Sequence, residues 1–168
     1  KAITDPAYGI DYSTIVTAMA RNGTEFGIRV SGLGDQWFTA PAPEVKGLFL
    51  PGYSSHDAGF DMGDSAITET VGWGGFVIGG APGILSLVGG TPDEALQYSR
   101  DMKKITTALH PTYLMPALGF RGAPIGIDIR KVIQSNVLPI IDTAMAHKEP
   151  GYPIIGAGLV HPPMDCFK

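Results

Sequence analysis

The chain has 168 residues, about the length of one domain. Its formal net charge is -4 and its 12 Lys and Arg are scattered, which excludes electrostatic attraction to nucleic acid or to an anionic membrane. The only cysteine, Cys166, has no partner for an intrachain disulfide, which fits a reducing cytoplasm. With 23 Gly, 14 Pro and 17% charged residues, the composition favours a compact fold with many short connections over a helical bundle or a disordered tail.

The first third of the chain predicts one helix and three strands. Asp11 is a suitable N-cap for a helix over residues 12–20. Residues 26–30 alternate apolar and other side chains, the pattern of a half-buried strand. Two further short strands are predicted at residues 37–40 and 47–50, with prolines between them.

The stretch from Asp61 to Gly80 combines a polar start with a glycine-rich end. The spacing of Ile67, Val71, Gly74 and Ile78 predicts a helix that begins near Ser65. Asp61 or Asp64 would then lie at its N-terminus, where free N–H groups favour a carboxylate.

The glycine-rich half has no charged residue from Val71 to Pro92, which raises the alternative of a membrane-embedded segment. The many glycines and Pro82 favour a buried core helix instead. Gly75, Gly79 and Gly83 recur every four residues, so that another backbone could approach this helix closely.

The second half of the chain begins with a strong helix start at Thr91-Pro-Asp-Glu94, and an amphipathic helix follows to Leu109. Residues 124–130 predict a strand that leads into a short helix ending at Ser135. Buried strands are predicted at 137–141 and 154–160. Because helices and strands mix without regular βαβ alternation, the sequence predicts a single α+β domain of short strands, a Gly-rich buried helix and an amphipathic helix.

Asp61, Asp64 and Glu69 are candidates for acid-base chemistry, because crowded carboxylates raise one another's pKa. On an ideal helix, however, Asp64 and Glu69 point about 140° apart. Helix capping and a solvated face are the alternative interpretation of the cluster.

Four arginines lie beside a glycine or at a strand end, where a planar guanidinium and nearby N–H groups together suit carboxylate or phosphate. Simple solvation is the alternative for each of them. Together with two adjacent polar residues, the predicted binding residues are Arg21, Asn22, Arg29, Arg121, Asp128 and Arg130.

His147, Lys148 and Glu149 follow a predicted buried strand, a common place for functional loops. His147 could move a proton and Lys148 could neutralise an anion, although an ordinary charged turn would look the same. The histidines are not paired at metal-ligand spacing, and no dinucleotide fingerprint or Gly-x-Ser-x-Gly elbow occurs. The sequence therefore predicts neither a metal nor a cofactor.

With these residues in view, the chain resembles the YlbE-like family, bacterial proteins encoded beside FdrA-like proteins. The family's members look longer, and the chain resembles their C-terminal part, without their Rossmann-like N-terminal portion. The blocks that carry the resemblance cover most of the chain: residues 19–32, 61–72, 126–131, 146–151 and 156–158.

The resemblance implies a cytoplasmic subunit similar to those of oxamate carbamoyltransferase, which moves a carbamoyl group between oxalurate and phosphate in purine and allantoin breakdown. In this hypothesis the arginines hold small anionic substrates, Asp64, Glu69 or His147 manages the amide proton, and Lys148 offsets charge. Transfer would proceed by positioning and electrostatic stabilisation. The alternative is a non-catalytic assembly subunit whose glycine-rich helix docks an FdrA-like partner subunit or a second copy of the chain.

Overall fold

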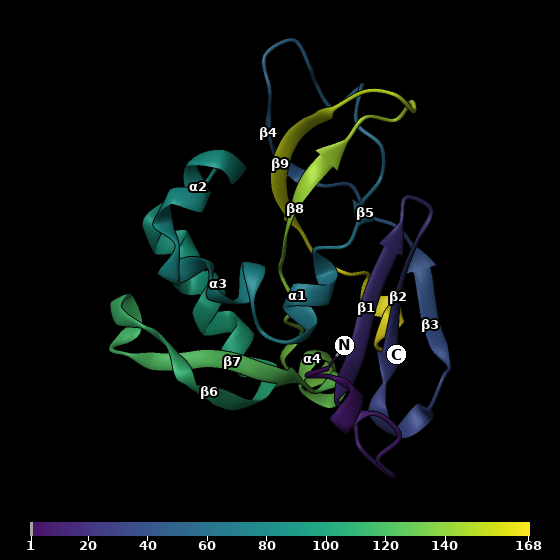
Figure 1. Ribbon diagram of the computed structural model, residues 1–168, viewed down its shortest axis with the longest axis vertical. Coiled ribbons are helices and arrows are strands. Elements are labelled where there is room, and N and C mark those ends of the chain that lie inside the picture. Colours follow the sequence, from purple (N-terminus) through teal and green to yellow (C-terminus); the bar gives the residue numbers. More distant parts are fainter. Residues whose placement is uncertain (1) are drawn as a thin grey trace.

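Three small antiparallel sheets and the helices between them make up the computed structural model, which describes residues 2–168 (Figure 1). The strand orders are β3-β2-β1-β5, β4-β9-β8 and β6-β7. In Figure 1 the first sheet lies at the right, the second at the top, and the β6-β7 ribbon at the lower left. The predicted α+β class and single domain are confirmed.

The first sheet contains β1 (Val16–Asn22), β2 (Glu25–Val30), β3 (Trp37–Pro41) and the short β5 (Met62–Gly63). It confirms the strands predicted at 26–30 and 37–40. The helix predicted over 12–20 is wrong, because β1 begins at Val16 and pairs antiparallel with β2. Its β-branched residues prefer a pleated surface, and that preference outweighs the N-cap signal.

The second sheet contains β4 (Lys46–Phe49), β8 (Ile141–Ala146) and β9 (Ile154–Val160). The strands predicted at 47–50 and 154–160 are confirmed. The strand predicted at 137–141 is misplaced, because β8 begins only at Ile141. Pro139, which has no N–H to donate to a ladder, lies just before this start.

The third sheet is a two-stranded ribbon of β6 (Thr106–Met115) and β7 (Arg121–Ile127), joined by a 3-10 turn, η4 (Pro116–Leu118). The strand predicted at 124–130 corresponds to the end of β7, and the short helix after it is α4 (Ile129–Ser135). The predicted extension of the amphipathic helix to Leu109 is wrong, because α3 ends at Lys104 and residues 106–109 begin β6, which pairs with β7. The register of β6 shifts between Leu109 and Leu114. The ribbon projects from the rest of the molecule (Figure 1).

The stretch from Ser65 to Val88 forms three short helices instead of the single predicted helix: α1 (Ala66–Thr70), the 3-10 helix η3 (Gly74–Gly80) and α2 (Pro82–Val88). Gly72 and Gly74 have left-handed φ angles of 85° and 59°, which end α1 and redirect the chain. Close approach at the glycines occurs within the chain itself. A Cβ on Gly75 would lie 2.5 Å from the Ile140 carbonyl oxygen.

The predicted helix start at Thr91 is confirmed by α3 (Pro92–Lys104), which has a complete capping box between Thr91 and Glu94. The remaining 3-10 segments are η1 (Asp5–Ala7), η2 (Ser31–Leu33) and η5 (Met164–Cys166). Phe26, Phe76 and Met102 are among the largest fully buried side chains of the core. Between residues 2 and 168, no helix has both the length and the apolar character needed to cross a membrane.

Candidate functional site

A buried ion pair joins β1 to the segment before α1. Arg21 Nε lies 2.8 Å from Asp61 Oδ1, and both side chains are fully buried. Arg21 Nη2 also donates to Ser65 Oγ at 2.5 Å and to Thr143 Oγ1 at 2.6 Å. Burial raises the pKa of Asp61 to about 6, while the Arg21 charge acts in the opposite direction. The contacts of Arg21 therefore connect β1 to the start of α1 and to β8.

Glu69 forms a second buried polar contact on α1. Its Oε1 accepts from Gly75 N at 2.9 Å and from Asp142 N at 3.1 Å, and its Oε2 accepts from Thr68 Oγ1 at 2.9 Å. The residue is 0% exposed. Burial raises its pKa to about 7, and the hydrogen bonds oppose that rise. Glu69 thus joins α1, η3 and β8 through a carboxyl group that titrates near neutral pH.

The three carboxylates of this segment do not form one site. Asp64 is exposed at the start of α1, away from the buried contacts of Glu69. The capping interpretation is also wrong for Asp61 and Glu69, because both are buried and α1 begins after Ser65 without a side-chain cap bond.

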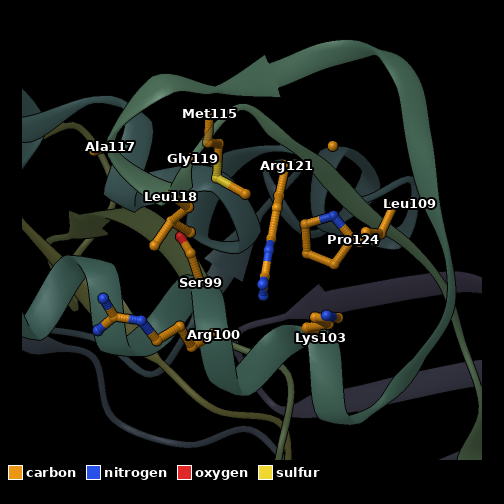
Figure 2. A pocket seen from close by; sticks show the side chains of 11 residues that line it. Ser99, Arg100, Lys103, Leu109, Met115, Ala117, Leu118, Gly119, Arg121 and Pro124 are labelled. Carbon is orange, nitrogen blue, oxygen red and sulfur yellow. The ribbon is translucent and has the colours of Figure 1, made fainter.

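A basic pocket lies between α3 and the β6-β7 ribbon. Its polar lining consists of Ser99, Arg100, Lys103 and Arg121, and its volume is about 430 Å³. Figure 2 shows Arg121 extending from the ribbon toward α3, with Lys103 and Ser99 on the helix below it. No acidic residue lines the pocket within the part of the chain that the structure describes. We define the basic pocket by these four residues and by the apolar residues Leu109, Met115, Leu118 and Pro124.

The three cations of the basic pocket are free of ion pairs. Across residues 2–168, the Arg100, Lys103 and Arg121 side chains have no ion-pair or hydrogen-bond partner. The nearby carboxylate of Asp101 contacts Lys104 at 2.6 Å instead. An anion in the pocket would therefore meet positive charge that no described residue neutralises.

The other predicted binding residues lie elsewhere. Arg29 contacts Asp35 at 2.6 Å and lies over the Tyr8 and Trp37 rings. Asp128 caps α4 by accepting from Arg130 N, and its carboxylate also lies 3.6 Å from Arg130 Nε.

Asn22 accepts from Thr24 N and Glu25 N in the turn between β1 and β2. Of the six predicted binding residues, only Arg121 lines the basic pocket.

His147 and Lys148 lie at the hairpin between β8 and β9. The His147 ring stacks on Tyr152 with centroids 3.9 Å apart, and its Nδ1 accepts from Glu149 N. Lys148 Nζ donates to His56 O at 2.6 Å. Their contacts hold this hairpin against the loop at residues 53–57, separate from the contacts of Glu69 and Arg21.

Sequence reasoning missed Ser99, Arg100 and Lys103. The spacing of Arg100 and Lys103, three residues apart on a helix, places them on one face and was available as a signal. Arg121 lies opposite this face of α3 because α3 packs on the β6-β7 ribbon, and the sequence does not show that packing.

Comparisons with known proteins show which proteins this chain is similar to. Residues 1–65 match the family model described as oxamate carbamoyltransferase subunit AllG. The whole chain is 56% identical to the uncharacterized protein YahG of Escherichia coli K12 and 47% identical to the oxamate carbamoyltransferase subunit AllG of the same strain. It spans 36% and 40% of the lengths of these two relatives.

A crystal structure of a conserved protein of unknown function from Enterococcus faecalis V583 has the same fold. The TM-score is 0.95 and the identity is 56%, over 98% of this chain and 39% of that one. These comparisons support the similarity to a carbamoyltransferase subunit. They do not test the link to YlbE-like or FdrA-like proteins, which stays a prediction.

Proposed function

We propose that this chain forms the small-anion-binding part of a subunit of a carbamoyltransferase-type enzyme, on the premise of its 47% identity to AllG over all 168 residues. The observation that carries the proposal is the basic pocket, where Arg100, Lys103 and Arg121 have no counter-charge among the described residues. Oxamate and its carbamoylated form are small anions. The pocket offers them an Arg fork and further positive charge.

The division of roles follows from burial. Arg121 is exposed to the pocket and would contact substrate directly. Glu69 and Arg21 are buried and would act by positioning α1 and β8. The acid-base roles of Asp64, Glu69 and His147, and the charge-offsetting role of Lys148, stay predictions.

Titration calorimetry on the full-length protein tests the proposal, with oxamate as the ligand. We expect Arg121→Ala to weaken binding about 10-fold or more, because a charge-assisted pair contributes roughly 1.5–3 kcal/mol. Lys46→Ala is the control, since it removes the same charge from β4 in another sheet. Equal affinities of wild type and Arg121→Ala for oxamate would contradict the proposal.

A second candidate function, a non-catalytic assembly subunit, is favoured by the exposed apolar side chains of the ribbon. Leu114 is 47% exposed and Phe120 is 67% exposed. At Gly75 and Gly79 the close approach is made by this chain's own Ile140 and α3, so these two positions are not open to a partner backbone. If a partner subunit binds this chain, we expect it to contact the ribbon.

A further inference from the structure

We infer that a second, uncharged pocket binds a small, neutral aromatic molecule that carries a carbonyl acceptor and an N–H donor, such as an aromatic carboxamide or lactam. This pocket lies on the face of the β6-β7 ribbon opposite the basic pocket. Its volume is about 320 Å³, at the lower end of the range for small-molecule sites. The inference is independent of the proposed function, because it concerns a different cavity and a different class of ligand.

The alternation of side chains along the ribbon separates the two pockets. Ala108 pairs with Ile125 across the strands, and both line the uncharged pocket together with His110. Leu109 pairs with Pro124, and both line the basic pocket. Because successive residues of a strand point to opposite faces, the ribbon has one pocket on each face.

The lining of the second pocket carries no full charge. No Asp, Glu, Lys or Arg of the described residues contributes to it, and its walls are mainly aliphatic, from Ile15, Val16, Val71, Ala108 and Ile125. Moving an ion into such surroundings costs free energy that no counter-charge offsets. The pocket therefore favours a neutral ligand, in contrast to the basic pocket.

Two ring N–H donors in this lining have no partner. His110 Nδ1 accepts from Thr112 N at 3.0 Å and from Tyr113 N at 3.1 Å, so the proton of the neutral ring is on Nε2. The described residues offer no oxygen or nitrogen acceptor to that N–H, nor to the indole N–H of Trp73. Both side chains are half-buried. The pocket therefore presents donors to a carbonyl oxygen.

Thr70 supplies a complementary acceptor. It is 5% exposed at the end of α1, and its hydroxyl donates to the Ala66 carbonyl oxygen at 2.9 Å. Because its single proton is used in that bond, only the lone pairs of Oγ1 remain for a ligand. An N–H group of the ligand would satisfy them. Donors and an acceptor in one lining are the pattern that an amide or a lactam complements.

An aromatic cluster forms one side of the pocket. The Tyr113 ring packs edge-on against Trp73 with centroids 5.6 Å apart, and its centroid lies 4.4 Å from that of His110. Tyr113 thus contacts both rings that carry the unpartnered N–H groups. Aromatic rings pair favourably in edge-to-face and offset arrangements, so a planar aromatic ligand would extend this cluster.

Ligand-observed NMR titration of the full-length protein with benzamide, in competition with toluene and with benzoate, tests the inference. The three probes share a phenyl ring and differ in their polar group, which is a neutral amide, absent, or an anion. We expect benzamide to bind, and the other two to displace it only at higher concentrations, because benzamide alone matches the donors and the acceptor without bringing a charge.

Other results with these probes would overturn the inference. Toluene that displaces benzamide at equal concentration would contradict the assigned hydrogen bonds. Benzoate that displaces benzamide at lower concentration would contradict the preference for a neutral ligand. Absence of benzamide binding would overturn the site itself.

Two variants locate the site. Trp73→Phe keeps a ring and removes the indole N–H, whereas His110→Asn keeps an acceptor for the two backbone amides and removes the Nε2 donor. We expect each to weaken benzamide binding about 3-fold to 10-fold, the effect of one hydrogen bond. Trp37→Phe and His56→Asn are the matched controls, since neither residue lines the pocket.

Thermal melting of each variant separates lost binding from lost folding. Benzamide affinity that is unchanged in both Trp73→Phe and His110→Asn would overturn the assignment of this pocket. Oxamate binding should be the same in these variants as in wild type, because the basic pocket lies on the other face of the ribbon. Failure of this inference therefore leaves the proposed function standing.

Discussion

Glu69 is a carboxyl group held in place by two backbone amides and one hydroxyl, without contact with solvent. Its surroundings suit the protonated form. Thr68 Oγ1 also lies 2.6 Å from the Ser65 carbonyl oxygen, so its single hydroxyl proton is shared between that oxygen and Glu69 Oε2. A proton on Glu69 Oε2 would resolve this competition by donating to Thr68 Oγ1.

This environment predicts a pH dependence of folding stability. Burial raises the pKa of Glu69 from 4.5 to about 7, so the folded chain keeps a proton that the unfolded chain releases in this window. The free energy of unfolding therefore falls as the pH rises from about 4.5 to 7, by up to ~3 kcal/mol from this residue. Burial of Asp61 acts with the same sign between pH 3.8 and about 6.

Glu69→Gln should remove the contribution of Glu69 to this pH dependence. Gln keeps an acceptor for the two amides and places a donor toward Thr68, as the protonated acid does. We expect the variant to be more stable than wild type at pH 8 and closer to it at pH 5, measured by urea unfolding. Asp64→Asn, which changes an exposed carboxylate next to the same helix, is the control. Equal pH slopes in wild type and Glu69→Gln would contradict the assignment.

At the scale of elements, the glycine-rich segment is a packing device. Gly75 and Gly79 let η3 approach the Ile140 backbone and α3, whereas Gly83 on α2 has no atom within 4 Å of an added Cβ. The glycine repeat at every fourth residue, which predicted close approach of another backbone, therefore has two different structural meanings.

Gly75→Ala should destabilise the fold, because its Cβ would lie 2.5 Å from the Ile140 carbonyl oxygen. Overpacking of this kind costs on the order of 1–3 kcal/mol. Gly83→Ala is the matched control, which we expect to be neutral or stabilising by up to ~1 kcal/mol. Thermal and urea unfolding measure both. If Gly75→Ala were as stable as Gly83→Ala, the close contact between Gly75 and the Ile140 backbone would not contribute to the stability of the fold.

At the scale of the whole molecule, the β6-β7 ribbon is a two-stranded sheet that packs on α3 with one face and carries exposed apolar side chains elsewhere. Two-stranded ribbons are marginally stable alone, and this one carries exposed apolar side chains near its tip. If a partner subunit binds this chain, as the second candidate function requires, we expect these exposed apolar side chains to lie in the contact.

Phe120→Asn tests that surface. Phe120 is 67% exposed and has a left-handed φ of 57°, which Asn tolerates, so the variant should fold normally. We expect it to weaken association of the full-length protein, alone or with an FdrA-like subunit, in sedimentation velocity. Tyr12→Asn is the matched control, because Tyr12 is 97% exposed with a φ of 61°. Unchanged association in Phe120→Asn would argue against the assembly role.

Much of the fold was predictable from local patterns. The capping box at Thr91 and Glu94 and the alternation at 26–30 act over a few residues, so the sequence alone determines them. The helix predicted over residues 12–20 was wrong because the cap signal at Asp11 is local, whereas the strand is stabilised by pairing with β2. A pattern within one segment does not show which other segment pairs with it. The single helix predicted after Ser65 is interrupted because Gly72 and Gly74 have left-handed φ angles. The spacing of apolar residues along the sequence does not reveal such backbone conformations.

The site depended on contacts between distant segments. The sequence by itself identified Arg121, Arg21 and Glu69 as residues suited to anions or protons. Only the tertiary structure decided that Arg21 is neutralised by Asp61, that Glu69 is enclosed by Gly75 and Asp142, and that Arg121 meets α3. The physical reason is that ionisable groups take their roles from burial and neighbouring charge, and these are set by how sheets and helices pack.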